Sequence, residues 1–171
     1  MPTNVEIKAK VADLVPIRAA IEPLADGPAQ VLDQEDIFFA APDGRLKLRT
    51  FGDGNGELIH YHRGDIAGPE TSHYTIAQTT APEALKAILT SILGVVGVVR
   101  KRRWLYRVRQ TRVHLDEVEG LCEFVELEVV LRPEQAEVEG VAIVQDMMAR
   151  LGIAGDQLVE MAYIDLMGGG P

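Results

Sequence analysis

The sequence contains one cysteine, Cys122, among its 171 residues, so no disulfide can form within the chain. This excludes a small secreted domain framed by disulfides and agrees with a reducing compartment. Aromatic residues make up only 5% of the chain and hydrophobic residues 47%, which is an ordinary balance for a folded protein. A chain of this length can bury a substantial core without covalent support.

Long apolar runs are also missing. No uncharged stretch approaches the roughly 18 residues that a membrane-spanning helix needs. The first residues, 1–4, lead directly into a charged strand-like segment, without the basic and then apolar regions of a secretory signal. We therefore expect a cytoplasmic protein with no membrane partner.

Basic residues are scarce, because 17 Lys and Arg face 26 Asp and Glu and leave a net charge of −9. This balance argues against nucleic acid as a partner. The charges are segregated, however. Seven of the 17 basic residues lie between Arg100 and Arg112, and nine of the 26 acids lie between Asp116 and Glu139. Such local gathering indicates a specific anion site rather than a basic surface.

Alternation of apolar and polar residues predicts strands along much of the chain. Turn signals such as Pro42-Asp43-Gly44 separate the strands. Helices are predicted after Asp13, from Thr80 to Gly94, and from Pro133 to Gly152. The predicted strands cover residues 5–11, 31–40, 45–51, 58–63, 72–78, 95–109, 112–118 and 124–131, with a last short strand at 163–166.

The strands come in runs joined by turns, without a repeating strand-helix rhythm. This order predicts an α+β fold, an eight-stranded, mostly antiparallel closed β-barrel with helices packed outside. A single domain is expected over residues 1–167, followed by a flexible tail at 168–171.

Several strands carry like charges on one face, as in Arg45, Lys47 and Arg49, or in Glu126 and Glu128. For one strand alone, the ordinary interpretation is a solvent-facing side. Like charges adjacent on one face are destabilising, so their recurrence on several strands points to bound ions of opposite charge. Inside a closed barrel, basic side chains would bind phosphate oxygens, and carboxylates would hold Mg²⁺ or Mn²⁺.

The segment Glu6-Ile7-Lys8-Ala9-Lys10 resembles the Glu-x-Glu-x-Lys signature of the CYTH superfamily, the triphosphate tunnel metalloenzymes. The resemblance is nearest to bacterial class IV adenylyl cyclase-like proteins. It continues in order along the chain, through the segments 34–39, 44–49, 99–103, 114–118, 124–128 and 162–167.

The resemblance implies a tunnel that holds a triphosphate chain with Mg²⁺ or Mn²⁺ as cofactor. It assigns metal binding to Glu6, Asp116, Glu126 and Glu128, and catalytic roles to Lys10 and Asp116. The phosphate-binding residues that it implies are Lys8, Lys10, Arg45, Lys47, Arg49, Arg63, Lys101, Arg103 and Arg112.

The activity stays open between an adenylyl cyclase, which converts ATP to cyclic AMP and pyrophosphate, and a triphosphate phosphohydrolase. Tripolyphosphate, thiamine triphosphate or a nucleotide would be the substrate of the latter. In this reading Lys8 stands where the motif has glutamate, which supports an alternative function as a non-catalytic polyphosphate or nucleotide binder. The sequence leaves open whether the chain forms a homodimer.

Three other motifs suggest rival functions. His60 and His62 could form a His-x-His metal site, but no acid follows at the spacing of such sites. The glycines between Gly52 and Gly56 lack the lysine and following helix of a phosphate-binding loop and indicate a hairpin turn. The run 100–103 with nearby aromatic residues resembles a nucleic-acid patch, which the net acidity argues against.

Overall fold

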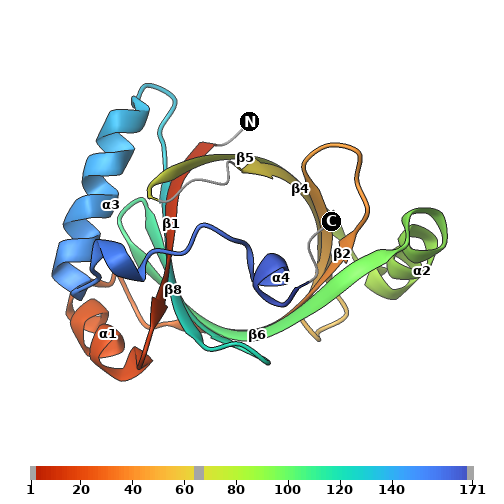
Figure 1. The fold of residues 1–171 in the computed structure, drawn as a ribbon, viewed down its shortest axis with the longest axis horizontal. Helices are drawn as coiled ribbons and strands as arrows, with labels where there is room; N and C mark the ends of the chain where they lie inside the picture. Colours follow the sequence, from red (N-terminus) through yellow and green to blue (C-terminus); the bar gives the residue numbers. More distant parts are fainter. Residues whose placement is uncertain (1–2, 64–67, 169–171) are drawn as a thin grey trace.

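The computed structural model describes residues 3–63 and 68–168. Its strands form a closed antiparallel barrel in the order β1-β5-β4-β3-β2-β6-β7-β8, and β8 returns to pair with β1. Figure 1 shows this ring end-on. The expected α+β barrel is confirmed. The strands are β1 (Thr3–Val11), β2 (Gln30–Phe39), β3 (Arg45–Thr50), β4 (Gly56–Arg63), β5 (Glu70–Thr79), β6 (Val95–Val108), β7 (Thr111–Val118) and β8 (Glu123–Val130).

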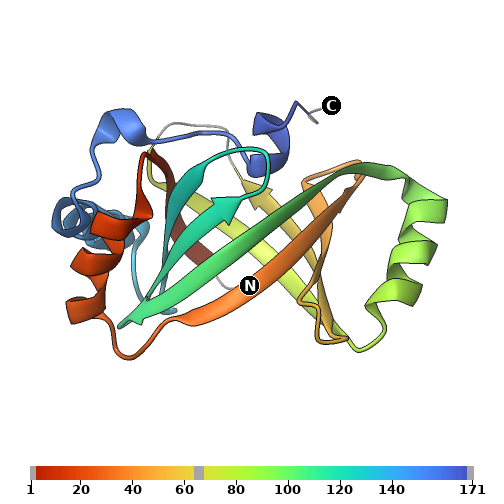
Figure 2. The same ribbon diagram turned by 90° about the horizontal axis from the view of Figure 1, so that it is seen from below.

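Helices cover the outside of the barrel and one of its ends. The helices α1 and α3 lie together beside β1 and β8, α2 lies on the opposite side against β2 and β3, and α4 crosses one end (Figures 1 and 2). The helical segments are α1 (Leu14–Ile21), α2 (Pro82–Leu93), α3 (Glu137–Leu151), α4 (Tyr163–Leu166) and the short 3-10 turns η1 (Glu22–Leu24) and η2 (Gly155–Gln157).

Local chemistry fixes the ends of the longer helices. The Asp13 carboxylate accepts a hydrogen bond from the Val15 amide at 2.8 Å, which confirms Asp13 as the cap of α1. Gly152 ends α3 with a left-handed φ of 68°, a conformation that glycine adopts without strain. Gly94 ends α2 as the sequence predicts.

Two predicted elements differ from the structure. Residues 163–166 form the helical turn α4 rather than a strand, and the Ala162 carbonyl accepts hydrogen bonds from the Asp165 and Leu166 amides at 3.0 and 3.1 Å. A closed barrel has no strand edge left for them to extend. The helix α3 begins at Glu137 rather than Pro133, because the Glu139 carboxylate accepts from the Ala136 amide and starts the helix there.

The largest hydrophobic core lies between the outer face of the barrel and the helices. Outward-facing Ile7, Val113 and Leu127 are at most 2% exposed and pack in one cluster with Ile21 of α1 and Val144 of α3. A second cluster lies under α2 and a third under α4. Because the apolar sides of the strands face the helices, the charged sides face the barrel interior.

Candidate functional site

A cavity of about 780 Å³ occupies the barrel interior. All eight strands contribute to its wall, most of them through alternate residues, because successive side chains of a strand point to opposite faces. The like-charged faces that the sequence singles out contribute Lys47, Arg49, Glu126 and Glu128 to this wall. These four charges line the interior of the closed barrel, as expected, whereas Arg45 of the same strand face does not line the cavity.

One side of the cavity is a basic wall, defined as Lys47 and Arg49 of β3 with Lys101 of β6. All three converge on the carboxylate of Asp36, which is 1% exposed. Arg49 donates to both Asp36 oxygens at 2.7 and 2.8 Å. Lys47 and Lys101 donate to Oδ2 at 2.8 and 3.2 Å. Each cation uses only some of its N–H donors on Asp36, so the wall is suited to bind further oxyanions.

Charges at the basic wall shift the ionisation of its members. Burial alone would raise the pKa of Asp36, but the charges of Arg49, Lys101 and Lys47 outweigh it and hold that pKa well below its ordinary value. Burial lowers the pKa of Lys101 from 10.5 to about 7, against the opposing attraction of Asp36. Asp36 is therefore ionised at neutral pH, and Lys101 gains or loses its proton near neutral pH.

Arg103 joins the basic wall to the acidic side of the cavity. Its guanidinium donates to both oxygens of Asp116 at 2.7 and 2.6 Å and to Glu126 at 2.7 Å. The Tyr163 hydroxyl also donates to Asp116 at 2.8 Å. Asp116 is fully buried and does not line the cavity, so the structure makes it a counter-ion of Arg103 rather than the metal-binding or catalytic group expected from the sequence.

The acidic side contains a three-residue group that fits a divalent cation. Donor atoms of His114, Glu126 and Glu128 lie within 4.8 Å of one another. Burial would raise the pKa of Glu126, yet the charge of Arg103 and the hydrogen bond from His114 hold it well below its ordinary value. Carboxylate oxygens are the ligands that Mg²⁺ and Mn²⁺ prefer. Glu126, Glu128 and His114 would hold such an ion.

Strand β1 presents two of its three predicted motif residues to the cavity. Asn4, Glu6 and Lys8 line the cavity, whereas Lys10 is exposed near the strand end and does not. Of the predicted motif residues, Glu6 and Lys8 therefore lie on the cavity wall and Lys10 does not, while Asn4 occupies the next inward position along β1. The spacing alone does not distinguish these positions, because a period-two pattern matches equally well when it is shifted by two residues.

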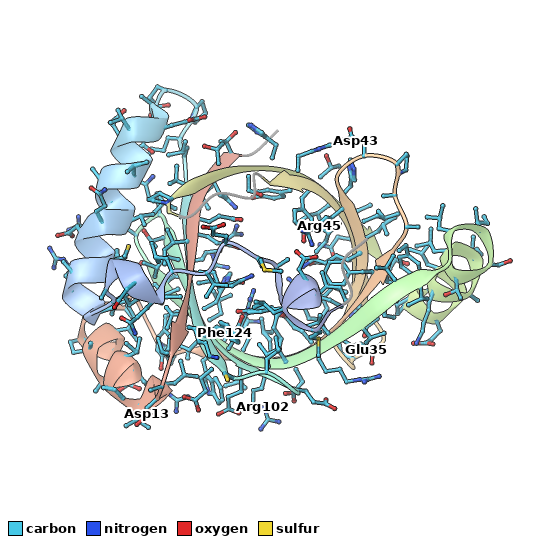
Figure 3. The ribbon with its side chains drawn as sticks, in the orientation of Figure 1. Asp13, Glu35, Asp43, Arg45, Arg102 and Phe124 are labelled. Atoms are coloured by element: carbon cyan, nitrogen blue, oxygen red, sulfur yellow. The ribbon has the colours of Figure 1, made fainter. Side chains whose placement is uncertain are left out.

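Lys8 is buried where β1 meets the C-terminal segment. Its ammonium donates to the Met161 carbonyl at 3.1 Å, lies 3.6 Å from a Glu126 oxygen and sits 4.0 Å from the centre of the Tyr163 ring. Arg45 forms an ion pair with Asp165 of α4 at 2.6 Å and does not line the cavity. Figure 3 places Arg45 beside α4. These contacts hold α4 across one end of the barrel.

The structure thus brings together most of the predicted phosphate-binding residues. Lys8, Lys47, Arg49, Lys101, Arg103 and Arg112 line the cavity, and Arg45 and Lys10 do not. The side chain of Arg63 lies outside the described residues, as do residues 169–171 of the predicted tail. Sequence reasoning missed Asp36, although its position two residues from Gln34 on an inward face was a usable signal.

Several residues of the rival motifs lie outside the cavity. His60 and His62 lie on the outer face of β4 with ring centres 4.9 Å apart, away from the cavity wall. Arg100 and Arg102 do not line the cavity either and pair with Glu35 and Asp33 at 2.8 Å each. Figure 3 shows Arg102 and Glu35 on the outside of the barrel. The basic run therefore splits between the two faces of β6. Among the described residues, no helix is both long and apolar enough to cross a membrane.

Comparisons with known proteins agree with this geometry. The chain is 26% identical to adenylate cyclase CyaB of Aeromonas hydrophila, covering 94% of this chain and 86% of that protein. The structure of the PH1012 protein from Pyrococcus horikoshii superposes with a TM-score of 0.83 at 27% identity, covering 95% of this chain and 98% of that one.

A Hippeastrum protein, HpAC1, whose structure is described with a dominant triphosphatase activity, superposes with a TM-score of 0.63. It is 16% identical, covering 90% of this chain and 89% of that one, and supports the fold alone. The sequence model of the CYTH domain family matches residues 2–163. The barrel, its charged interior and this match over nearly the whole length agree, and the chain belongs to the CYTH domain family.

Proposed function

We propose that this protein is a divalent-metal-dependent enzyme that acts on a triphosphate-bearing substrate inside the barrel. One observation carries the proposal. A single cavity contains a basic wall around Asp36 and, on its other side, a carboxylate and imidazole group with donor atoms within 4.8 Å of one another. A phosphate chain complexed with a divalent cation matches both charges at once.

Each part of the cavity has a role in this proposal. Lys47, Arg49 and Lys101 bind phosphate oxygens on one side, and Arg103 reaches the phosphates next to the acidic group. Such fixed cations place the chain for in-line attack and stabilise negative charge that develops on the transferred group. Glu126 and Glu128, with His114, would hold Mg²⁺ or Mn²⁺, which when bound neutralises phosphate charge and activates phosphorus toward attack.

Two reactions are compatible with this cavity. A ribose 3′-hydroxyl that attacks the α-phosphorus of ATP gives cyclic AMP and releases pyrophosphate. Water that attacks the terminal phosphorus releases orthophosphate from a nucleotide, tripolyphosphate or thiamine triphosphate. The similarity to an adenylate cyclase supports the first reaction. The second is supported by the cavity itself, which can hold any triphosphate chain with a divalent cation. The choice depends on which phosphorus meets the nucleophile in line.

A substrate panel tests the proposal. The full chain is incubated with ATP, tripolyphosphate or thiamine triphosphate plus Mn²⁺, and cyclic AMP, pyrophosphate and orthophosphate are measured. We expect one substrate to give product, and chelation of the metal with EDTA to stop the reaction. An Arg49→Met variant tests the basic wall separately. It keeps the acidic group but loses one cation of the basic wall, and it should lose most of the turnover.

A non-catalytic binder of polyphosphate or nucleotide is the competing function. It is favoured by the protein cations that already neutralise the acidic side, with Arg103 at 2.7 Å from Glu126 and Arg112 at 2.8 Å from Glu128. Tight binding of all three compounds without product from any of them would establish this alternative and refute the enzyme proposal.

A further inference from the structure

Asn4 holds a buried polar atom that the fold does not satisfy. The side chain is 2% exposed and lines the cavity, and its Oδ1 has no hydrogen-bond partner. Among the described residues, only three other buried side-chain atoms share this state, which are Arg18 Nε, Gln34 Oε1 and Arg112 Nε. Burying an amide oxygen without a partner is unfavourable, so its position in the cavity wall indicates a ligand.

The neighbours of Asn4 define what that ligand is. Asn4 lies two residues from Glu6 on the same face of β1, about 7 Å along the strand. Glu6 lies opposite Glu128 of β8, and Asn4 lies opposite Ser72 of β5. Asn4 therefore shares the cavity wall with two carboxylates that are paired across β1 and β8, where oxygen atoms from neighbouring strands can surround a hard cation.

We propose that Asn4 Oδ1 is a neutral oxygen ligand of a divalent cation that Glu6 and Glu128 also bind. This inference rests on the proposed function, in which the cation accompanies a triphosphate, and it extends the group of His114, Glu126 and Glu128 through the shared Glu128 to β1. An amide at this position gives the site one negative charge less than a carboxylate would. The cation alone is then bound weakly and is retained chiefly together with phosphate oxygens.

The local charges support a weak site. Arg112 lies 2.8 Å from Glu128, and Lys8 lies 3.6 Å from Glu126, so the acidic side is already partly neutralised. An amide contributes only a dipole to cation binding, whereas a carboxylate contributes a full charge. Adding one charge at residue 4 should therefore have a large effect on cation affinity.

Titration with Mn²⁺ alone tests the inference. The free Mn²⁺ signal is followed by electron paramagnetic resonance with the full chain, without any phosphate compound. For Asn4→Asp we expect the Kd for Mn²⁺ to fall by about tenfold or more, since cation sites are tuned by the number of charged ligands. Gln34→Glu is the matched control, because it adds the same charge at the other unpartnered buried amide among the described residues, on β2 opposite Lys101 of β6.

Each result of the Mn²⁺ titration either supports or overturns the role of Asn4. An unchanged Kd in Asn4→Asp, or an equal gain in Gln34→Glu, overturns the inference. If Asn4→Asp folds poorly, its melting temperature should rise with added Mn²⁺ by more than that of the wild type, because a ligand that binds only the folded state stabilises it. Absence of that additional rise also overturns it. As a second variant, Asn4→Ala should weaken Mn²⁺ binding several-fold, and wild-type affinity would contradict the inference.

These measurements do not depend on turnover. If the Mn²⁺ affinities change as expected and the substrate panel gives no product, the proposed enzyme activity fails while the cation site stands. If a substrate gives product and Asn4→Asp leaves Mn²⁺ binding unchanged, the role of Asn4 fails while the enzyme proposal stands.

Discussion

Arg103 and Asp116 face each other across β6 and β7 and form a two-pronged ion pair, with nitrogen to oxygen distances of 2.7 and 2.6 Å. Both side chains are at most 5% exposed. Asp116→Asn removes one of the two carboxylate charges that balance Arg103, and because Glu126 remains, we expect a cost at the lower end of the about 3–5 kcal/mol that breaking a buried pair costs in unfolding free energy. Urea denaturation measures this loss.

The same variant tests where the metal binds. Because Asp116 does not line the cavity, we expect Asp116→Asn to keep the wild-type Kd for Mn²⁺ under conditions where it stays folded. A loss of Mn²⁺ affinity of an order of magnitude would restore Asp116 as a metal ligand.

Glu126→Gln should abolish metal-dependent turnover. The carboxylate belongs to the group with His114 and Glu128, and a neutral amide both weakens cation binding and releases Arg103. We expect a loss of at least about 100-fold in kcat/KM, above the range seen when groups supporting metal ligands are changed. Glu119→Gln, in the exposed turn after β7, is the control and should react at the wild-type rate. Retained activity in Glu126→Gln would remove this residue from the metal site.

Asp36→Asn should destabilise the fold, since the three cations of the basic wall lose their shared anion. We expect a cost of about 3–5 kcal/mol at pH 7. The folded pKa of Asp36 is depressed, so its stabilisation is present above the unfolded value of about 4 and is lost as pH falls through the folded pKa.

The difference between wild type and Asp36→Asn should therefore shrink on acidification, as chemical denaturation at several pH values would show. Asp33→Asn is the control, because Asp33 is an exposed partner of Arg102 and its loss should leave stability nearly unchanged. An equal effect of the two substitutions would contradict the role given to Asp36.

Phosphate binding should depend on pH near neutrality through Lys101. Burial lowers its folded pKa to about 7, so the ammonium is increasingly lost as pH rises through that value. A bound phosphate favours the charged form, and at pH 8 we expect tripolyphosphate binding to be accompanied by proton uptake at this group. Calorimetry in buffers of different ionisation enthalpy measures that uptake, and Lys101→Arg should reduce it.

The pH dependence of stability has the same sign for Lys101 as for Asp36, because the folded pKa of each group lies below its unfolded value, but the Lys101 window lies at higher pH. The unfolded pKa of Lys101 near 10.4 exceeds the folded value of about 7, so the unfolded chain binds more protons between these limits. Stability from this group therefore increases as pH rises from about 7 toward 10.

The calorimetric experiment also has an outcome that contradicts this assignment. If Lys101→Arg takes up as many protons on tripolyphosphate binding as the wild type, Lys101 is not the titrating group.

Lys8→Met should loosen α4 while leaving the barrel intact. The substitution keeps a chain of similar length but removes the hydrogen bond to the Met161 carbonyl and the cation over the Tyr163 ring. We expect faster amide hydrogen exchange for Asp165 and Leu166 and unchanged exchange in β7 and β8. Equal exchange at α4 in both proteins would show that Lys8 does not hold the C-terminal segment.

Much of the fold could be read from the sequence. Strand alternation gave all eight strands to within a few residues, and the like-charged faces of Arg49 and Glu128 predicted an ionic interior. These features are local, because side-chain direction along a strand follows from the backbone period alone. Helix ends at Asp13, Gly94 and Gly152 were predictable for the same reason, since capping involves only nearby atoms.

Other features required the tertiary structure. The sequence shows Lys8 and Lys10 as equivalent positions on one face, and only the closed barrel with its covering segment buries one and exposes the other. The sequence predicted Asp116 to be a metal ligand, whereas in the structure Arg103 and Tyr163 both donate hydrogen bonds to its carboxylate.

The sequence by itself therefore determined which side of each strand is charged, and with it the barrel and its polar interior. The tertiary structure decided which of those charges remain at the cavity surface and which neutralise one another, as Asp36 does for Lys47. The reason is physical, because pairing between side chains distant in the chain depends on strand register and closure, which no local pattern contains.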